Sequence, residues 1–325
     1  MTALLVAESV TRRFVRHRSL GDRIAAAFGA ASDGRAVQAV TDVCLSLSQG
    51  ETLGLVGESG CGKSTLGRIL AGIMAPSSGR VLLDGAPPMQ AGRKITTRIQ
   101  TVFQDPFASL NPRKRIGEGI AEGPIAHGIV TRAASGVLVA DWLARVGLDP
   151  DVAQRFPHQF SGGQRQRVAI ARALAMRPDV LICDEPVASL DVSIQAQILN
   201  LFLDLRRDLG LTCLFISHDL NVVRHVSDRV AIMYLGRIVE SGDAARVYAA
   251  PGHPYTRALL ASSPRLGLDQ AVTLRPIAGE LPSPLAPPTG CAFHPRCPMA
   301  SDICRQERPP LVQRGDGQLL ACHHG

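Results

Sequence analysis

The sequence predicts an α/β fold organised around a phosphate-binding loop. Three observations predict it: Gly57–Thr65 fits the pattern G-x-x-x-x-G-K-[ST], a short apolar strand precedes it at residues 52–56, and helical spacing follows it to Ile73. Apolar runs at residues 180–183 and 211–216 have the composition of further strands buried inside a sheet. Strand, loop and helix therefore follow one another as in a nucleotide-binding core.

The loop has the residues that polyphosphate binding requires. Glycines let the backbone pass close to the phosphates, so that N–H groups and the start of the following helix face the negative charge. Lys63 is expected to neutralise the β- and γ-phosphates, and the Ser64 hydroxyl to ligate Mg²⁺. The alternative is a glycine-rich turn with an incidental Lys-Ser pair, which chance supplies in roughly one chain per hundred of this length, so nucleotide binding is favoured. The predicted binding residues of the loop are Gly57, Glu58, Ser59, Gly60, Cys61, Gly62, Lys63, Ser64 and Thr65.

An acidic pair follows the next buried strand. Asp184, directly after Val180–Cys183, is placed to hold Mg²⁺, usually through water. Glu185 is then placed to accept a proton from an attacking water, as a general base. Alone, such a pair would more often be an ordinary acidic strand end. In a chain that also has a phosphate-binding loop, the functional interpretation is favoured.

Residues Ser161–Gln164 predict a second anion site. Ser161 is a good N-cap for a helix that continues through Leu174, and Gly162 and Gly163 leave bare N–H groups at its start. Two anion sites in one chain could bind two phosphates separately. They could instead bind one nucleotide sandwiched between two copies of the chain.

Composition and charge limit the class of protein. The chain has 325 residues, is 46% hydrophobic and carries a formal net charge of +7, which suits a globular α/β protein and argues against global disorder. No apolar stretch approaches the roughly 20 residues that span a bilayer. The N-terminal arginines follow a short apolar opening instead of preceding a longer one, unlike a signal peptide. We expect a cytosolic protein that contacts a membrane through partners.

The chain is expected to divide into a nucleotide-binding domain, residues 1–262, and a tail, residues 263–325. Within the first, residues 105–176 lack long β-rich runs and have helical spacing, which predicts an inserted helical subdomain. Val230–Met233 and Ile238–Val239 predict a terminal hairpin. The tail begins as a proline-rich linker and ends in a cluster of cysteines.

Taken in order, the motifs resemble the full set of the ABC (ATP-binding cassette) ATPases. They are Gly57–Thr65, Gln104, Ser161–Gln164, Val180–Glu185, Ser189–Asp191 and His218. The resemblance implies a P-loop NTPase core with an antiparallel β-subdomain, the inserted helical subdomain and a cysteine-containing C-terminal extension. It also implies that ATP lies between the loop of one subunit and the second anion site of the other, formed by Ser161, Gly162, Gly163 and Gln164.

The resemblance implies roles for single residues. Gln104 resembles the glutamine that senses Mg²⁺ and the attacking water, so Ser64, Gln104 and Asp184 are the expected Mg²⁺ ligands. Asp191 resembles the aspartate that communicates across the dimer, and His218 the switch histidine that contacts the γ-phosphate. Phe14 is in the place of the aromatic residue that stacks on adenine. The expected catalytic residues are Glu185, His218, Gln104 and Lys63.

Three further stretches narrow the resemblance to the ATPases of oligopeptide/dipeptide importers. Val102–Arg113 and His253–Leu260 are similar to that branch, and Cys291–Pro298 to its C-terminal extension. The resemblance implies ATP hydrolysis at the cytoplasmic face of the plasma (inner) membrane. The implied partners are a second ATPase subunit, identical or paralogous, two permease subunits and an extracytoplasmic substrate-binding protein, with no nucleic acid. Nickel or glutathione importers, a soluble ABC-type ATPase acting on DNA or ribosomes, and a nucleotide-gated scaffold are the alternatives.

Cys291, Cys297, Cys304 and Cys322 predict a metal site in the tail. In a cytosolic protein such a cluster indicates metal ligation more than disulfides, although its spacing is not the tight C-x-x-C pairing of zinc ribbons. The segment is too short to bury a useful core, so a metal would stabilise it. The resemblance to dipeptide-transporter ATPases implies a [4Fe–4S] cluster. Free thiols, or zinc with His323 or His324, are the alternatives.

Overall fold

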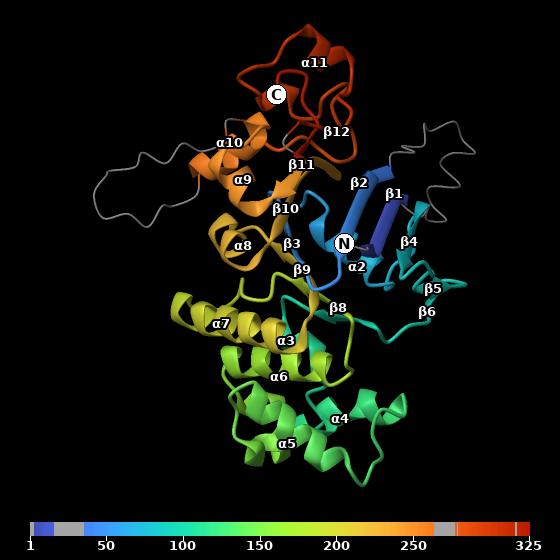
Figure 1. Ribbon diagram of the computed structural model, residues 1–325, viewed down its shortest axis with the longest axis vertical. Helices are drawn as coiled ribbons and strands as arrows, with labels where there is room; N and C mark the ends of the chain where they lie inside the picture. The colour runs from blue at the N-terminus through green and yellow to red at the C-terminus, as the bar shows by residue number, and fades with distance from the viewer. Residues whose placement is uncertain (1–2, 16–35, 263–276, 278, 316) are drawn as a thin grey trace, which may run out of the picture.

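The structure is a computed structural model and describes residues 3–15, 36–262, 277, 279–315 and 317–325. A mixed sheet occupies the middle of the molecule, helices of the chain's central part extend from one end, and the C-terminal tail covers the other end (Figure 1). Among the described residues, no helix is long and apolar enough to cross a bilayer.

Eight strands form the core sheet, in the order β12-β13-β11-β10-β3-β9-β8-β7. They are β3 (Thr52–Val56), β7 (Ile99–Val102), β8 (Val180–Asp184), β9 (Thr212–Ser217), β10 (Arg229–Tyr234), β11 (Arg237–Asp243), β12 (Val312–Gln313) and β13 (Leu319–Leu320). The five from β10 to β7 run parallel. In β8, Val180 and Ile182 pack into one hydrophobic core, and Leu181 and Cys183 into the other. Burial on both faces explains why these strands are continuous apolar runs in the sequence.

An antiparallel sheet, in the order β2-β1-β4, packs beside the core sheet. Its strands are β1 (Ala3–Val15), β2 (Ala36–Ser48) and β4 (Ser78–Leu83), and a small hairpin of β5 (Met89–Gln90) and β6 (Arg93–Lys94) follows. This is the β-subdomain that the family resemblance implies. Leu5, Val40 and Leu47 of this sheet share a hydrophobic core with the helix that follows the phosphate-binding loop.

Helices cover both faces of the core sheet. They are α2 (Lys63–Leu70), α7 (Val192–Leu209), α8 (Leu220–Val226), α9 (Ala244–Ala249) and α10 (Pro254–Ser262). The predicted apolar face of α7 is buried at Ile198, Phe202 and Leu205, and the helix ends at Gly210, whose φ of 61° favours glycine. Leu66 and Ile69 of α2 lie in one core and Val223 of α8 in the other, so the sheet is enclosed on both sides.

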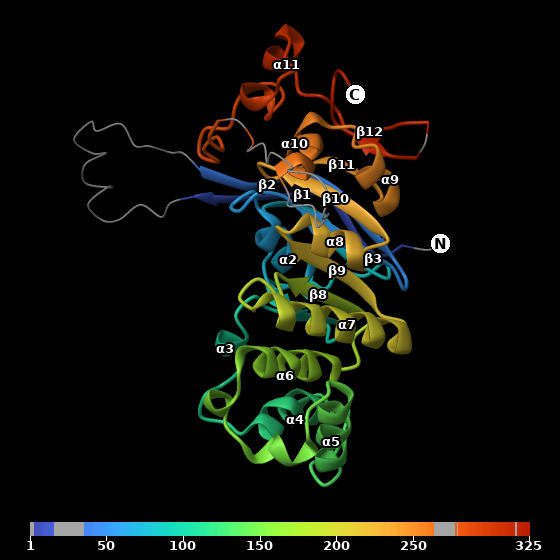
Figure 2. The same cartoon turned by 90° about the vertical axis from the view of Figure 1, so that its left-hand side faces the viewer.

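Between residues 106 and 174 every described element is helical. These elements are α3 (Pro106–Ser109), α4 (Ile116–Ala126), α5 (Ser135–Arg145) and α6 (Gly162–Leu174), with 3₁₀ turns at Pro150–Gln154 and Pro157–Gln159. Trp142 and Leu143 of α5 pack with Ile120 of α4 and Val168 of α6. Helix α7 lies between this bundle and the sheet (Figure 2).

The tail requires two corrections to the sequence prediction. It contains a 3₁₀ turn (His294–Arg296), α11 (Asp302–Gln306), β12 and β13. The predicted hairpin of β10 and β11 is present, but it is not terminal, because β13 pairs antiparallel with β11. The tail also contributes to a hydrophobic core, contrary to the prediction. The Phe293 side chain is 1% exposed and packs into the main hydrophobic cluster.

Candidate nucleotide-binding and hydrolysis site

The phosphate-binding loop lies between β3 and α2, as its sequence predicts. Gly62, at the N-cap position of α2, has a φ of 107°. A Cβ atom there would lie 2.0 Å from the backbone carbonyl oxygen of Ala39 in β2. Only glycine meets both requirements, because a side chain would need a strained backbone and space that β2 already occupies. The loop therefore depends on close approach of the antiparallel sheet.

The Lys63 side chain points back toward the loop, and the Ser64 side chain points toward β8. The Lys63 ammonium is buried and donates hydrogen bonds to the carbonyl oxygens of Gly57, at 2.8 Å, and Glu58, at 3.0 Å. The Ser64 hydroxyl donates to Oδ1 of Asp184 at 2.8 Å. Burial raises the pKa of Asp184, and the hydrogen bond from Ser64 opposes that rise. The loop serine and the strand-end aspartate thus share one small polar site.

Glu185 and His218 form the second part of this site. Their strands, β8 and β9, are parallel neighbours, so both side chains emerge at the same edge of the sheet. Nδ1 of His218 lies 3.3 Å from Oε2 of Glu185. Glu185 has a φ of 49°, and its N–H donates to the carbonyl of Ile216 at 3.0 Å. The neighbouring strand thus holds Glu185 in an uncommon backbone conformation, with its carboxylate facing the histidine.

Three predicted residues lie apart from this group. Gln104 is exposed just beyond β7, whose Val102 is paired with Cys183 of β8, so it lies near the same edge of the sheet. Asp191 is exposed at the N-cap position of α7. Phe14 in β1 is 37% exposed, with the Arg12 guanidinium 4.8 Å from its ring centroid. Among the described residues, no hydrogen bond joins any of the three to Lys63 or Glu185.

The second predicted anion site opens onto solvent at the start of α6. Ser161 Oγ accepts a hydrogen bond from the Gln164 N–H at 3.3 Å, and Gln164 Oε1 accepts one from the Ser161 N–H at 3.0 Å. This capping box satisfies two backbone donors and orders the helix start. A Cβ atom on Gly163 would lie 2.5 Å from the Ile194 side chain of α7. The motif belongs to the helical end of the molecule, whereas the loop lies beside the sheet (Figure 1).

The structure does not support a metal centre at the four tail cysteines. All four thiols are free, and no group of three or more His, Cys, Asp or Glu in the described part of the chain could hold a metal ion. Burial raises the pKa of Cys291 and of Cys297, and the neighbouring thiols of Cys304 and Cys322 raise it further.

Sequence reasoning missed two residues that hold the phosphate-binding loop. Tyr255 of α10 accepts a hydrogen bond from the Glu58 N–H at 2.9 Å. Arg296 of the tail makes two hydrogen bonds to the Glu58 carboxylate, at 2.8 and 3.0 Å. The contacts join residues 197 and 238 positions apart, which no local pattern could reveal. The only signal was that both lie in stretches similar to the peptide-importer branch.

The fold and this set of motifs define an ABC-type ATP-binding cassette. Residues 40–188 match the model of the ABC transporter family, and residues 239–304 match the model of the oligopeptide/dipeptide transporter C-terminal region. The chain belongs to the ABC transporter family. Within it, the chain belongs with the oligopeptide/dipeptide transport ATP-binding proteins.

Known proteins resemble the chain over most of its length. It is 51% identical over 294 residues to a protein of Sinorhizobium fredii named a probable peptide ABC transporter ATP-binding protein, covering 88% of this chain and 82% of the relative. It is 49% identical to the oligopeptide transport ATP-binding protein AppF of Bacillus subtilis, covering 88% and 89%. The dimeric, post-hydrolysis structure of the ATP-binding cassette MJ0796 with ADP and phosphate is 27% identical, with a TM-score of 0.62, over 74% of this chain and 98% of that one.

Proposed function

We propose that this chain binds and hydrolyses ATP to drive an importer of dipeptides or oligopeptides. The observation that supports this best is the arrangement of five side chains at one edge of the core sheet, in a chain whose tail matches the oligopeptide/dipeptide C-terminal region. These side chains are Lys63, Ser64, Asp184, Glu185 and His218. The relatives' names refer to peptides, dipeptides and oligopeptides.

Each of these side chains has a part in hydrolysis. Lys63 leaves the loop carbonyls and neutralises the β- and γ-phosphates. Glu185 takes a proton from water as the water oxygen attacks the γ-phosphorus and the bond to the ADP oxygen breaks. His218 orients Glu185 and contacts the γ-phosphate, and Gln104 orients the water. Ser64 and Asp184 supply the oxygen ligands that Mg²⁺ prefers, and the bound ion would neutralise charge on the phosphates.

We place each ATP between two chains. The α6 N-terminus, with Ser161 and Gln164, is exposed and belongs to the helical end of its own chain, so a second chain can present it to the γ-phosphate. Asp191 lies at the exposed start of the neighbouring α7 and is proposed to contact the same interface. Phe14 is proposed to stack on adenine. ATP then holds the dimer closed, and loss of the γ-phosphate lets it open.

Mixing two inactive variants tests this arrangement. Lys63→Ala removes the charge in the loop, and Ser161→Asp keeps an N-cap while placing a negative charge against the phosphate. If the site is shared, a mixed dimer has one site with both lesions and one intact site, so mixing should restore up to about half of the wild-type turnover per mixed dimer. If both halves of the site lay in one chain, the mixture would stay inactive; an inactive mixture would disprove a site shared between two copies of this chain.

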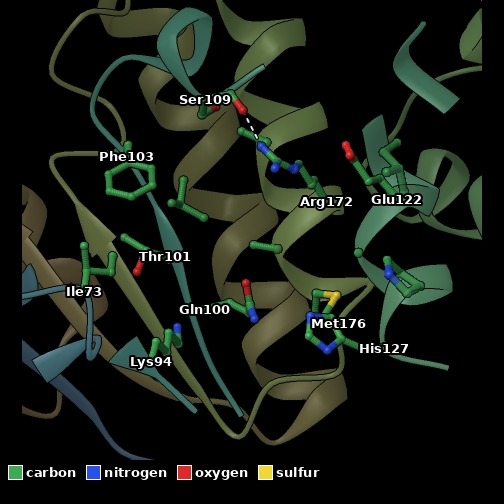
Figure 3. A pocket seen from close by; sticks show the side chains of 16 residues that line it. Ile73, Lys94, Gln100, Thr101, Phe103, Ser109, Glu122, His127, Arg172 and Met176 are labelled. Carbon is green, nitrogen blue, oxygen red and sulfur yellow. Dashed lines mark hydrogen bonds between the residues drawn. The ribbon is translucent and has the colours of Figure 1, made fainter. Parts of the chain in front are cut away.

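A pocket between the core and the helical subdomain is the proposed contact with the permease. It has a volume of about 310 Å³ and is lined by Phe103 and Ile73 on one side and by Glu122 and His127 on the other (Figure 3). Arg172 of α6 crosses its edge and donates to the Ser109 carbonyl. Because Phe103 precedes Gln104, a permease helix seated here would sense changes at the nucleotide.

Photo-crosslinking tests this contact in membranes that contain the complete transporter. A photoreactive residue at Ile73, which is 47% exposed, should crosslink to a permease chain. The same residue at Val137 on α5, which is 77% exposed, is the control and should not. Equal labelling from both positions would rule out the pocket as the docking site.

The cargo is tested in reconstituted transporter. Peptide-loaded binding protein should stimulate ATP hydrolysis, and peptides should enter the vesicles. Stimulation by nickel or glutathione in place of peptides would assign the chain to another importer. The chain is proposed to act at the cytoplasmic face of the inner membrane. Its proposed domains are a nucleotide-binding domain at residues 1–262, with a helical subdomain inserted at 105–176, and a tail at residues 263–325.

Metal binding by the tail stays a prediction. Its support is that the thiols of Cys304 and Cys322 lie close enough to those of Cys291 and Cys297 to raise the pKa of the latter two. Iron and zinc analysis of anaerobically purified protein, with visible and EPR spectra, decides it. A colourless protein without iron excludes the [4Fe–4S] cluster, and absence of zinc as well leaves free thiols.

A further inference from the structure

In the described part of the chain, the C-terminal tail hydrogen-bonds to the phosphate-binding loop at Glu58, whose backbone N–H, carbonyl and carboxylate are all engaged. Its N–H donates to Tyr255 Oη at 2.9 Å, and its carbonyl accepts from Lys63 at 3.0 Å. Its carboxylate binds Arg296 through both terminal guanidinium nitrogens, at 2.8 and 3.0 Å. The peptide that holds Lys63 is therefore itself held from outside the loop.

The contact is well shielded from solvent. The Arg296 side chain is 6% exposed and that of Glu58 is 22% exposed. Two parallel N–H···O bonds between a guanidinium and a carboxylate fix orientation as well as distance. A buried pair of this kind is screened little by salt, and removing one partner leaves the other charge uncompensated.

Aromatic packing sets the position of Arg296. Phe293, three residues earlier, lies 5.3 Å from Tyr234 and 5.4 Å from Tyr255, measured between ring centroids. Tyr234 and Tyr255 are 4.6 Å apart. The tail turn thus packs on the same two tyrosines that flank the loop, which leaves Arg296 little freedom to move away from Glu58.

We propose that Arg296 is a positioning residue of the phosphate-binding loop, through which the C-terminal tail sets the affinity of this chain for ATP. The inference rests on the proposed nucleotide site. Backbone N–H groups bind phosphate only when the loop already has the right shape, and any cost of reshaping it on binding is subtracted from affinity. With Arg296 in place, the Glu58 peptide stays fixed while Lys63 moves from the loop carbonyls to the phosphates.

The test measures binding of Mg-ATP to the full-length chain by calorimetry. Arg296→Gln should raise Kd about tenfold, which corresponds to about 1.4 kcal/mol. Arg296→Lys should raise it less, because an ammonium keeps the charge without the two-point geometry. The matched control is Arg305→Gln in the same tail, whose ion pair with Asp302 is exposed; Kd should stay unchanged.

A double-mutant cycle separates positioning from general damage to the fold. Because the two side chains act as a pair, Glu58→Gln with Arg296→Gln should weaken binding no more than the worse single change. Effects that multiply, or an unchanged Kd in a folded Arg296→Gln protein, overturn the inference. If Arg296→Gln does not fold, the same binding measurements are made on Arg296→Lys and Glu58→Gln.

Failure of the nucleotide site itself would show differently. Lys63→Ala should abolish binding in the same assay. If Lys63→Ala binds Mg-ATP as the wild type does, the proposed nucleotide site is wrong and the role of Arg296 falls with it. If Lys63→Ala fails to bind while Arg296→Gln binds normally, only the role of the tail is refuted.

Discussion

At the scale of single residues, the site depends on side chains placed by two neighbouring strand ends. Glu185 and His218 follow β8 and β9, and the parallel pairing of these strands brings their side chains to 3.3 Å. The residue types were predictable from the sequence, because each follows a recognisable apolar run. The pairing itself depends on which strands are neighbours in the sheet.

Glu185→Gln should leave ATP binding within about twofold of wild type and lower hydrolysis by about 10² to 10⁴, since an amide cannot take up the proton. Because the γ-phosphate is retained, the variant should also accumulate as an ATP-bound dimer. Phosphate release and size-exclusion chromatography with ATP measure the two effects. Glu118→Gln, on the exposed surface of α4, is the control. Undiminished turnover in Glu185→Gln would refute the base assignment.

At the scale of elements, α6 shows how one serine can serve both stability and function. Ser161 caps the helix through the Gln164 N–H and is also the residue proposed to contact the γ-phosphate of the partner's ATP. The capping pattern is local and could be predicted from the sequence. Its exposure could not, because exposure depends on how the helical subdomain packs against α7.

Ser161→Ala and Ser161→Asp should separate these roles. Loss of the cap in Ser161→Ala should lower the free energy of unfolding by about 1 kcal/mol, whereas Ser161→Asp retains a capping oxygen and should be close to wild type. Both should lose most ATP hydrolysis, Ser161→Asp more completely because its charge repels phosphate. Urea unfolding and phosphate release give the two readouts. Normal turnover in Ser161→Asp would remove Ser161 from the site.

The start of α10 contains a buried histidine that makes stability sensitive to acid. His253 is buried, its Nδ1 accepts a hydrogen bond from the Tyr255 N–H at 3.0 Å, and burial lowers its pKa from 6.5 to about 4. The unfolded chain therefore takes up this proton at a higher pH than the folded one. The contribution of neutral His253 to the free energy of unfolding is fully present above pH 6.5 and is lost as the pH falls toward 4.

When the pH falls from 7 to 5, His253 becomes protonated in the unfolded chain but stays neutral in the folded one. We expect this difference to lower the free energy of unfolding by about 2 kcal/mol. His253→Asn keeps an acceptor for Tyr255 and does not titrate, so it should lose correspondingly less over this interval. Burial raises the pKa of the neighbouring Glu240, which acts in the opposite direction, but both proteins retain it. Urea midpoints at the two pH values give the comparison. If the wild type and His253→Asn lose the same free energy of unfolding over this interval, His253 is not the group responsible.

At the scale of the whole molecule, the tail is part of the core. Strand β13 adds to the sheet beside β11, the buried Glu240 carboxylate accepts from the Gln318 side chain, and Phe293 packs among Tyr234 and Tyr255. The sequence suggested a proline-rich linker with a metal-dependent end. Residues 263–276 of that linker lie outside the described residues. Apolar packing and strand pairing hold the described part of the tail, and both need partners far away along the chain.

Phe293→Ala should lower the free energy of unfolding by about 3 to 5 kcal/mol, because it leaves a cavity in a well-packed aromatic cluster. Met299→Ala, in the same tail, should change it by less than about 0.5 kcal/mol, since Met299 is 43% exposed. Thermal and chemical unfolding of the full chain measure both. A Phe293→Ala protein as stable as wild type would show that the tail is not integrated into the core.

The sequence by itself determined the phosphate-binding loop, the acidic strand end, the capped start of α6 and the family, because these are patterns of neighbouring residues whose backbone demands are local. The tertiary structure alone decided that Arg296 and Tyr255 hold Glu58, that His218 faces Glu185, and that the tail completes the core. Those contacts join segments up to 238 residues apart, and their cause is the packing of sheet, helices and tail against one another.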